Sequence, residues 1–138
     1  MLDFIRVASA VPPVTVGDTV KNAEDICNYI RQADKGVHVL DVNVGVPGID
    51  EAKVMKNTIT SLQAVTDKPL QIDSSDFGAL EEAMRVYAGK PMVNSVNGKK
   101  ESLDAVLPLV KKYGGVLIAL TLDEEGIPDS AQGRFDIA

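Results

Sequence analysis

The sequence has few of the residues that disulfide, metal and nucleic-acid sites need. Its 138 residues include one cysteine, one histidine and no tryptophan. A single cysteine excludes an intramolecular disulfide framework and a zinc site built from several cysteines. Aromatic residues make up only 4% of the chain, so we expect no aromatic-lined groove for nucleic acid. The net charge of -6 also argues against nucleic acid and anionic membranes, because phosphate groups attract basic surfaces.

Long hydrophobic runs are missing as well. The longest apolar stretch, residues 116–120, is far too short to cross a bilayer. The first three residues are not a basic segment followed by a long apolar run, so we expect no signal peptide. Hydrophobic residues still amount to 45%, which is typical of a folded domain. We therefore expect one soluble, cytoplasmic domain over residues 1–138.

Short apolar segments alternate along the chain with segments of helical periodicity. The apolar segments are rich in Val, Ile and Leu without strict alternation, which is typical of parallel strands buried on both faces. They lie at residues 4–8, 37–44, 70–72, 92–93 and 116–120. Four helices are expected between them, with these N-caps: Asp18 or Thr19, Asp50, Asp76 and Ser102. Pro108 should kink the fourth helix, and residues 122–138 are expected to be an irregular tail.

This alternation predicts an α/β fold with about five parallel strands. Five strands are too few to close an eight-stranded barrel. Two architectures remain open, a partial TIM barrel and an open flavodoxin-like doubly wound sheet. Strand order separates them, because the barrel keeps the order 1-2-3-4-5 and the flavodoxin-like sheet has the order 2-1-3-4-5.

Polar residues stand where the expected strands end. Asp41 and Asn43 follow the second strand, Asp73 the third and Asn94 the fourth. Ligands of parallel α/β folds bind at the carboxyl ends of the strands. Carboxylates accept two N–H bonds and amides both donate and accept, which suits a heterocycle with an amino-pyrimidinone edge. The alternative is that these residues are helix caps or loop residues.

Five ordered motifs resemble the pterin-binding methyltransferase domain. That family is the methyltetrahydrofolate-binding barrel of corrinoid-dependent methyltransferases and of cobalamin-dependent methionine synthase. The resemblance covers residues 36–138. Its motifs are LDVNVG at 40–45, PGIDE at 47–51, LQIDS at 70–74, KPMVNSVNG at 90–98 and ALTLDEEGIP at 119–128.

The resemblance implies a ligand and a set of binding residues. In the family, the Asp of the Asp-Ser motif and the Asn of the Asn-Ser motif bind the pterin ring, and they match Asp73 and Asn94. Asp41 and Asn43 match a third rim motif. The implied reaction transfers the N5 methyl group of methyltetrahydrofolate, as substrate, to a corrinoid carried by another domain or protein. The resemblance implies no metal site.

Two departures from the family pattern produce further expectations. The family barrel has eight strands and this chain ends after about five, so we expect weak or no turnover from the chain alone. Residues 1–38 resemble the start of the nitrilase-like glutaminase domain of NAD synthetase, which suggests a chimera with a partial pterin-binding barrel over 39–138. The alternative function is a non-catalytic scaffold that self-associates as a homo-oligomer through exposed sheet edges.

Overall fold

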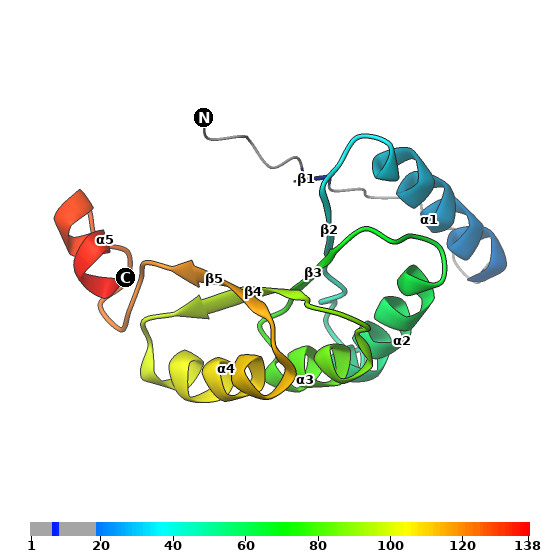
Figure 1. Cartoon of the computed structure of the whole chain (residues 1–138). Helices are drawn as coiled ribbons and strands as arrows, with labels where there is room; N and C mark the ends of the chain where they lie inside the picture. The colour runs from blue at the N-terminus through cyan, green and yellow to red at the C-terminus, as the bar shows by residue number, and fades with distance from the viewer. Residues whose placement is uncertain (1–6, 9–18) are drawn as a thin grey trace.

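Strands and helices alternate throughout the part of the chain described by a computed structural model, residues 7–8 and 19–138 (Figure 1). The elements are β1 (Val7–Ala8), α1 (Thr19–Asp34), β2 (Val39–Val42), α2 (Glu51–Gln63), β3 (Leu70–Asp73), α3 (Phe77–Val86), β4 (Met92–Asn97), α4 (Lys100–Tyr113), β5 (Val116–Leu120) and α5 (Ala131–Ile137). All neighbouring strands are parallel, in the order β1-β2-β3-β4-β5. This sequential order is that of a partial TIM barrel and differs from the order of the flavodoxin-like sheet.

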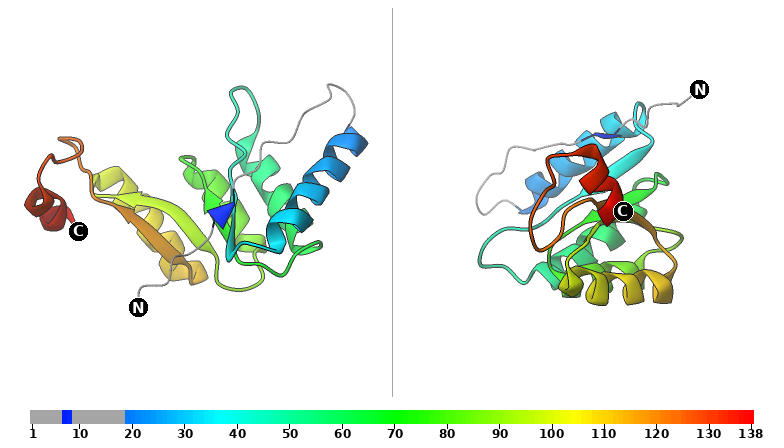
Figure 2. Two further views of the ribbon diagram at one scale, coloured as in Figure 1. Left: turned by 90° about the horizontal axis from the view of Figure 1, so that it is seen from above. Right: turned by 90° about the vertical axis from the view of Figure 1, so that its left-hand side faces the viewer.

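The sheet curves, and α1 to α4 follow one another along its outer side (Figure 1). Seen from above, α5 lies beyond β5, at the opposite end of the molecule from α1 (Figure 2). Among the residues described, no helix is long and apolar enough to span a membrane.

The hydrophobic core lies between the strands and α2, α3 and α4. Each helix contributes its buried face, as the helical periodicity predicted. The fully buried side chains of these helices include Met55 and Ile59 of α2, Leu80 of α3 and Val106 of α4. The strands contribute the side chains that point toward these helices, on the outer face of the sheet. They include Leu40, Leu70, Ile72 and Val93, and the alternate side chains of each strand lie on the opposite, inner face. One side of the sheet is therefore held against the helices by apolar burial.

Two of the expected helix caps are confirmed. The Oδ1 atom of Asp50 accepts a hydrogen bond from the Lys53 backbone N–H at 3.0 Å. The Oδ1 atom of Asp76 accepts from the backbone N–H groups of Gly78 at 2.7 Å and Ala79 at 3.1 Å. These bonds satisfy N–H groups that have no partner within the helix.

The expected cap at Ser102 is wrong. Helix α4 already begins at Lys100, two residues before Ser102. The Asn97 side chain accepts from the Lys99 backbone N–H at 3.0 Å and closes the turn that leads into the helix. Ser102 lies in the first turn of α4, buried, where its hydroxyl accepts from the Asn97 backbone N–H at 3.1 Å. The helix continues through Pro108 to Tyr113 and ends at Gly114, which has a positive φ of 79°.

The expectation of an irregular tail over residues 122–138 is wrong in part, because the tail contains helix α5. The Ser130 hydroxyl caps this helix by accepting from the Gly133 backbone N–H at 3.0 Å. None of the α5 residues is buried, and Phe135 is 75% exposed. The apolar periodicity that predicted the other helices comes from burial, so it gave no indication of α5.

Strand β5 is not buried on both faces, as its apolar sequence predicted, but partly exposed. Val116 is 44% exposed and Leu120 is 41% exposed. In the described part of the chain β5 is the last strand of the sheet, and its free edge has no partner there. This edge and the inner face beside it are therefore available for contact.

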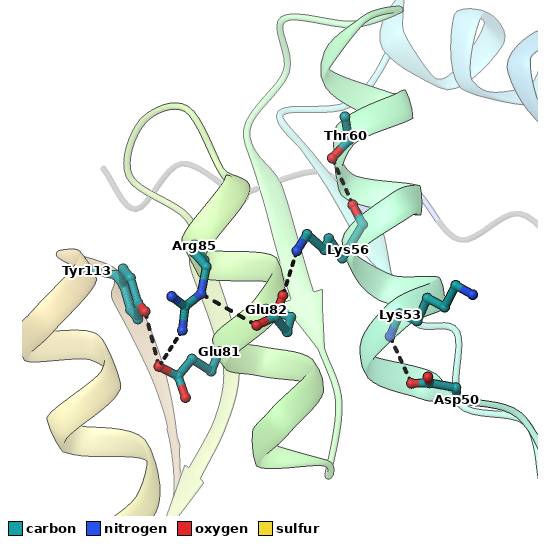
Figure 3. A network of polar contacts seen from close by, with 8 residues as sticks. All are labelled: Asp50, Lys53, Lys56, Thr60, Glu81, Glu82, Arg85 and Tyr113. Atoms are coloured by element: carbon teal, nitrogen blue, oxygen red, sulfur yellow. Dashed lines mark hydrogen bonds and ion pairs between the residues drawn. The ribbon is translucent and has the colours of Figure 1, made fainter.

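Ion pairs join the helices on the outer surface (Figure 3). Lys56 of α2 contacts Glu82 of α3 at 2.8 Å. Glu81 of α3 accepts from Lys112 and from the Tyr113 hydroxyl of α4, both at 3.1 Å. These donors hold the pKa of Glu81 below its ordinary value, and the Lys56 hydrogen bond does the same for Glu82. The pairs are partly exposed, so each adds little stability alone.

Substitution of one core leucine should destabilise the protein far more than substitution of an exposed one. Leu80 is fully buried, whereas Leu107 on α4 is 44% exposed. We expect Leu80→Ala to lower the free energy of unfolding by about 2–5 kcal/mol, through lost burial and a residual cavity. Urea unfolding followed by circular dichroism measures both variants. Equal losses for Leu80→Ala and Leu107→Ala would contradict the assigned core.

Candidate functional site

The carboxyl ends of β3 and β4 bring an acid and an amide side by side. Asp73 and Asn94 are register partners in the parallel pairing of these strands. The preceding pair, Ile72 and Val93, is fully buried on the helix side of the sheet. Because side chains alternate along a strand, Asp73 and Asn94 lie on the inner face.

An open pocket of about 340 Å³ lies at this end of the sheet. A pocket of this size is within the range of small-molecule sites. It is formed by the ends of β3 and β4 and the first turns of α3 and α4. Its lining residues are Asp73, Ser74, Ser75, Phe77, Asn94, Ser95, Asn97, Lys99, Glu101 and Ser102.

A bulge in β4 increases the number of polar groups at the pocket. The register with β5 shifts between Asn94, which pairs with Ile118, and Val96, which pairs with Ala119. Ser95 is therefore an extra residue in β4. Bulges re-aim side chains and are common beside functional sites. Here Asn94 and Ser95, which are consecutive in the sequence, both line the same pocket.

Asp41 lies on the same face of the sheet but outside this pocket. It pairs in register with Gln71 of β3, and the Gln71 amide donates to its Oδ1 atom at 2.6 Å. Partial burial raises the pKa of the Asp41 carboxyl above its ordinary value. The Gln71 hydrogen bond opposes this rise and the nearby negative charge of Asp73 adds to it. Asp41 is therefore electrostatically coupled to Asp73 across β3.

Asn43, the fourth residue proposed from the sequence, lies in the loop after β2. Its side chain is exposed, and its Oδ1 atom accepts from the Gly45 backbone N–H at 2.9 Å. This bond closes a local turn between β2 and α2. The structure thus brings Asp73 and Asn94 together in one pocket, places Asp41 nearby on the same face, and places Asn43 in an adjoining loop.

Eight pocket residues were not among the proposed binding residues, and three of these carry an aromatic ring or a charge. Phe77 is the first residue of α3, Lys99 is the N-cap of α4 and Glu101 lies in its first turn. The helix after each strand begins at the same end of the sheet as the strand's last residue. The first turn of the third expected helix could therefore have identified Phe77, whereas Glu101 precedes the cap expected at Ser102 and lay outside the fourth expected helix.

The chemistry of the pocket is that of recognition by hydrogen bonds. Two carboxylates, two amides and several hydroxyls offer acceptors and neutral donors, Phe77 offers an aromatic ring, and Lys99 offers one cation. Within residues 7–8 and 19–138, no cluster of three or more His, Cys, Asp or Glu residues could hold a metal ion. The arrangement therefore suits a flat polar ring with both N–H and carbonyl groups.

Comparison with known proteins gives two findings. The sequence profile of the pterin binding enzyme family matches residues 16–134. The chain is also similar to two curated proteins named methionine synthase, one from Mycobacterium tuberculosis (strain ATCC 25618 / H37Rv), at 31% identity, and one from Mycobacterium leprae (strain TN), at 28%. Each similarity extends over 112 residues and covers 78% of this chain. The chain spans only 9% of the length of either protein.

The family match bears on the chimera hypothesis. It begins at residue 16 and so includes α1, which the second resemblance assigned to a glutaminase-like segment. The comparisons do not support that second resemblance. Residues 4–6 of its first motif lie outside the part of the chain that the structure describes.

The raised pKa of Asp41 predicts a pH-dependent stability difference. The folded chain takes up this proton at a higher pH than the unfolded chain, so the free energy of unfolding falls as the pH rises through the folded-state pKa. Asp41→Asn removes this loss. In urea unfolding, we expect the stability of Asp41→Asn relative to the original chain to be greater at about pH 7 than at about pH 3. The exposed Asp67→Asn is the control and should show no such gain.

The coupling between Asp41 and Asp73 can be measured directly. In Asp73→Asn, we expect the pKa of Asp41 to fall, because the like charge that helps to raise it is gone. Carbon-13 NMR of the Asp41 carboxyl during a pH titration reports this pKa. An unchanged value would show that the two carboxylates do not interact.

Proposed function

The chain belongs to the pterin-binding enzyme family, and we propose that it binds methyltetrahydrofolate in the pocket between β3 and β4. One observation carries this proposal. Asp73 and Asn94 are register partners at the carboxyl ends of adjacent strands, and both line one pocket. They are also the residues that match the family's pterin-binding motifs.

The pocket groups complement the polar edge of a pterin. The amino-pyrimidinone edge of the ring presents adjacent N–H donors, and the Asp73 carboxylate can accept hydrogen bonds from them. The Asn94 amide can donate to a ring acceptor and accept from a ring N–H. Phe77 offers an apolar contact for the ring. The pocket carries Lys99 at its margin, which suits the carboxylate of the folate tail.

The reaction that fits this ligand is methyl transfer from N5 of methyltetrahydrofolate to a corrinoid. A corrinoid carried by another domain or protein would supply the nucleophile. The residues of this chain would hold the ring in a fixed orientation and assist delivery of a proton to N5. The similarity to two methionine synthases supports this assignment.

Removal of either proposed pterin contact should weaken binding. We expect Asp73→Ala and Asn94→Ala each to raise the Kd for methyltetrahydrofolate about 10-fold, which corresponds to the loss of a charged or amide hydrogen bond. Isothermal titration calorimetry of the full chain measures this change.

Two exposed residues outside the pocket provide matched controls. Asp67→Ala and Asn57→Ala remove the same side chains from positions that do not line it, and they should leave the Kd unchanged. Binding that is the same in all four variants would refute the assignment of the site.

The exposure of β5 favours a second candidate, a scaffold function through self-association. Val116 and Leu120 are more than one-third exposed, beside a strand edge with no partner in the described part of the chain. A second copy of the chain would cover this edge by strand pairing or by contact of the two inner faces. This assembly requires no ligand.

A charge on β5 should disrupt such an assembly. For the original chain we expect light scattering to give a molar mass that rises with concentration toward a dimer. We expect Leu120→Lys to remain monomeric, because its ammonium group cannot be buried against an apolar surface without a large cost. The same change at Leu107, which is exposed on the outer surface of α4, is the control. A monomer at all concentrations for the original chain would exclude self-association.

A further inference from the structure

Ser74 connects the two proposed pterin contacts to the rest of the fold. It is buried, with 6% exposure, and it directly follows Asp73. Its backbone N–H donates to the Asn94 carbonyl oxygen at 3.2 Å. Its hydroxyl accepts from the Asp76 backbone N–H at 2.9 Å. Through these two hydrogen bonds, Ser74 links the end of β3 to the end of β4 and to the N-cap of α3.

The Ser74 hydroxyl uses its single proton to donate to the carboxylate of Glu51. Glu51 is the first residue of α2, the helix that precedes β3, and lies 23 positions before Ser74 in the chain. A carboxylate is favoured at the start of a helix by the helix dipole. The contact thus fixes the β3–α3 loop to a rigid helix end instead of to another loop.

The β2–α2 loop also lies close to the Glu51 carboxylate. A Cβ atom at Gly45 would lie 3.5 Å from Oε2 of Glu51 and 3.7 Å from Oε1. The loop backbone at Gly45 is itself held by the Asn43 side chain at 2.9 Å. The Glu51 carboxylate therefore lies close to both rim loops, near Gly45 of the β2–α2 loop and Ser74 of the β3–α3 loop.

We propose that Glu51 is a positioning residue that acts through Ser74 to hold Asp73 and Asn94 in their binding arrangement. The proposal rests on the proposed pterin function of those two residues. Glu51 does not line the pocket, so its effect on a ligand passes through Ser74. Loss of its carboxylate leaves the buried hydroxyl with only the Asp76 carbonyl oxygen, at 3.5 Å, as acceptor and weakens the hold on the loop that carries Asp73.

The chain contains a matched control for this contact. Lys56 and Glu82 also join α2 to α3, through an ion pair of 2.8 Å on the outer surface (Figure 3). Neither of these residues lines the pocket. Removal of the Glu82 carboxylate weakens the contact between the same two helices and leaves the Ser74 bond intact. A merely structural role for Glu51 predicts equal effects of Glu51→Ala and Glu82→Ala.

The test compares four variants of the full chain, Glu51→Ala, Glu51→Gln, Ser74→Ala and Glu82→Ala. Calorimetry gives the Kd for methyltetrahydrofolate, and NMR hydrogen exchange gives the protection of the Ser74 and Asp76 amides. We expect Glu51→Ala and Ser74→Ala to raise the Kd about 10-fold or more, since small displacements of binding groups are costly. Glu51→Gln keeps an acceptor oxygen and should stay within about 3-fold of the original Kd.

The exchange measurement requires no ligand. In Glu51→Ala, we expect the Ser74 amide to exchange about 10-fold faster, whereas Glu82→Ala should leave its rate unchanged. The double variant Glu51→Ala/Ser74→Ala should bind no more weakly than the weaker single variant, because both changes remove one interaction. If Glu51→Ala does not fold, Ser74→Ala removes the same hydrogen bond and carries the test.

Each outcome decides between the two proposals. Unchanged Kd and unchanged exchange in Glu51→Ala and Ser74→Ala overturn the positioning role, as do equal effects of Glu51→Ala and Glu82→Ala. If the original chain binds no methyltetrahydrofolate, the proposed function fails. In that case the exchange rates alone establish or overturn the role of Glu51 in fixing the rim.

Discussion

The register between β3 and β4 is the constraint on which the candidate site depends. Ile72 pairs with Val93, and both are fully buried against the helices. The next pair, Asp73 and Asn94, must then lie on the opposite face. A slip of one residue would expose Ile72 and bury the Asp73 carboxylate among apolar side chains, which is unfavourable on both counts. The hydrophobic core therefore determines where the polar pair lies.

The two faces of the sheet differ because, in the described part of the chain, the core helices pack against only one of them. Helices α2, α3 and α4 bury the outer face, and their packing gives the chain its core. The inner face is polar toward β2 and β3, where Asp41 and Gln71 lie, and apolar toward β5, where Ile118 and Leu120 lie. The polar half of this face meets the pocket, and the apolar half leads to the free edge. The proposed ligand binding and the proposed self-association therefore concern different strands of one sheet.

Burial made most of the fold predictable from the sequence. The strand positions and the caps Asp50 and Asp76 were predicted because apolar periodicity and capping are local properties. Helix α5 was not, because none of its residues is buried. Exposed sheet edges were expected from the small number of strands, but the apolar run of β5 alone did not reveal that its side chains are exposed. The hydrogen bond between Glu51 and Ser74 joins residues 23 positions apart, and no local pattern could indicate it.

The polar character of the inner face is better explained by a ligand than by packing. Barrel interiors are usually filled with branched apolar side chains. Here partial burial raises the pKa of Asp41, and the like charge of Asp73 on the same face adds to this rise. The ionised carboxyl of Asp41 is therefore disfavoured in the fold. An apolar pair at these positions would avoid that cost. The N–H donors of a bound ring would instead form hydrogen bonds to these carboxylate oxygens, and the proposed pterin has several such donors.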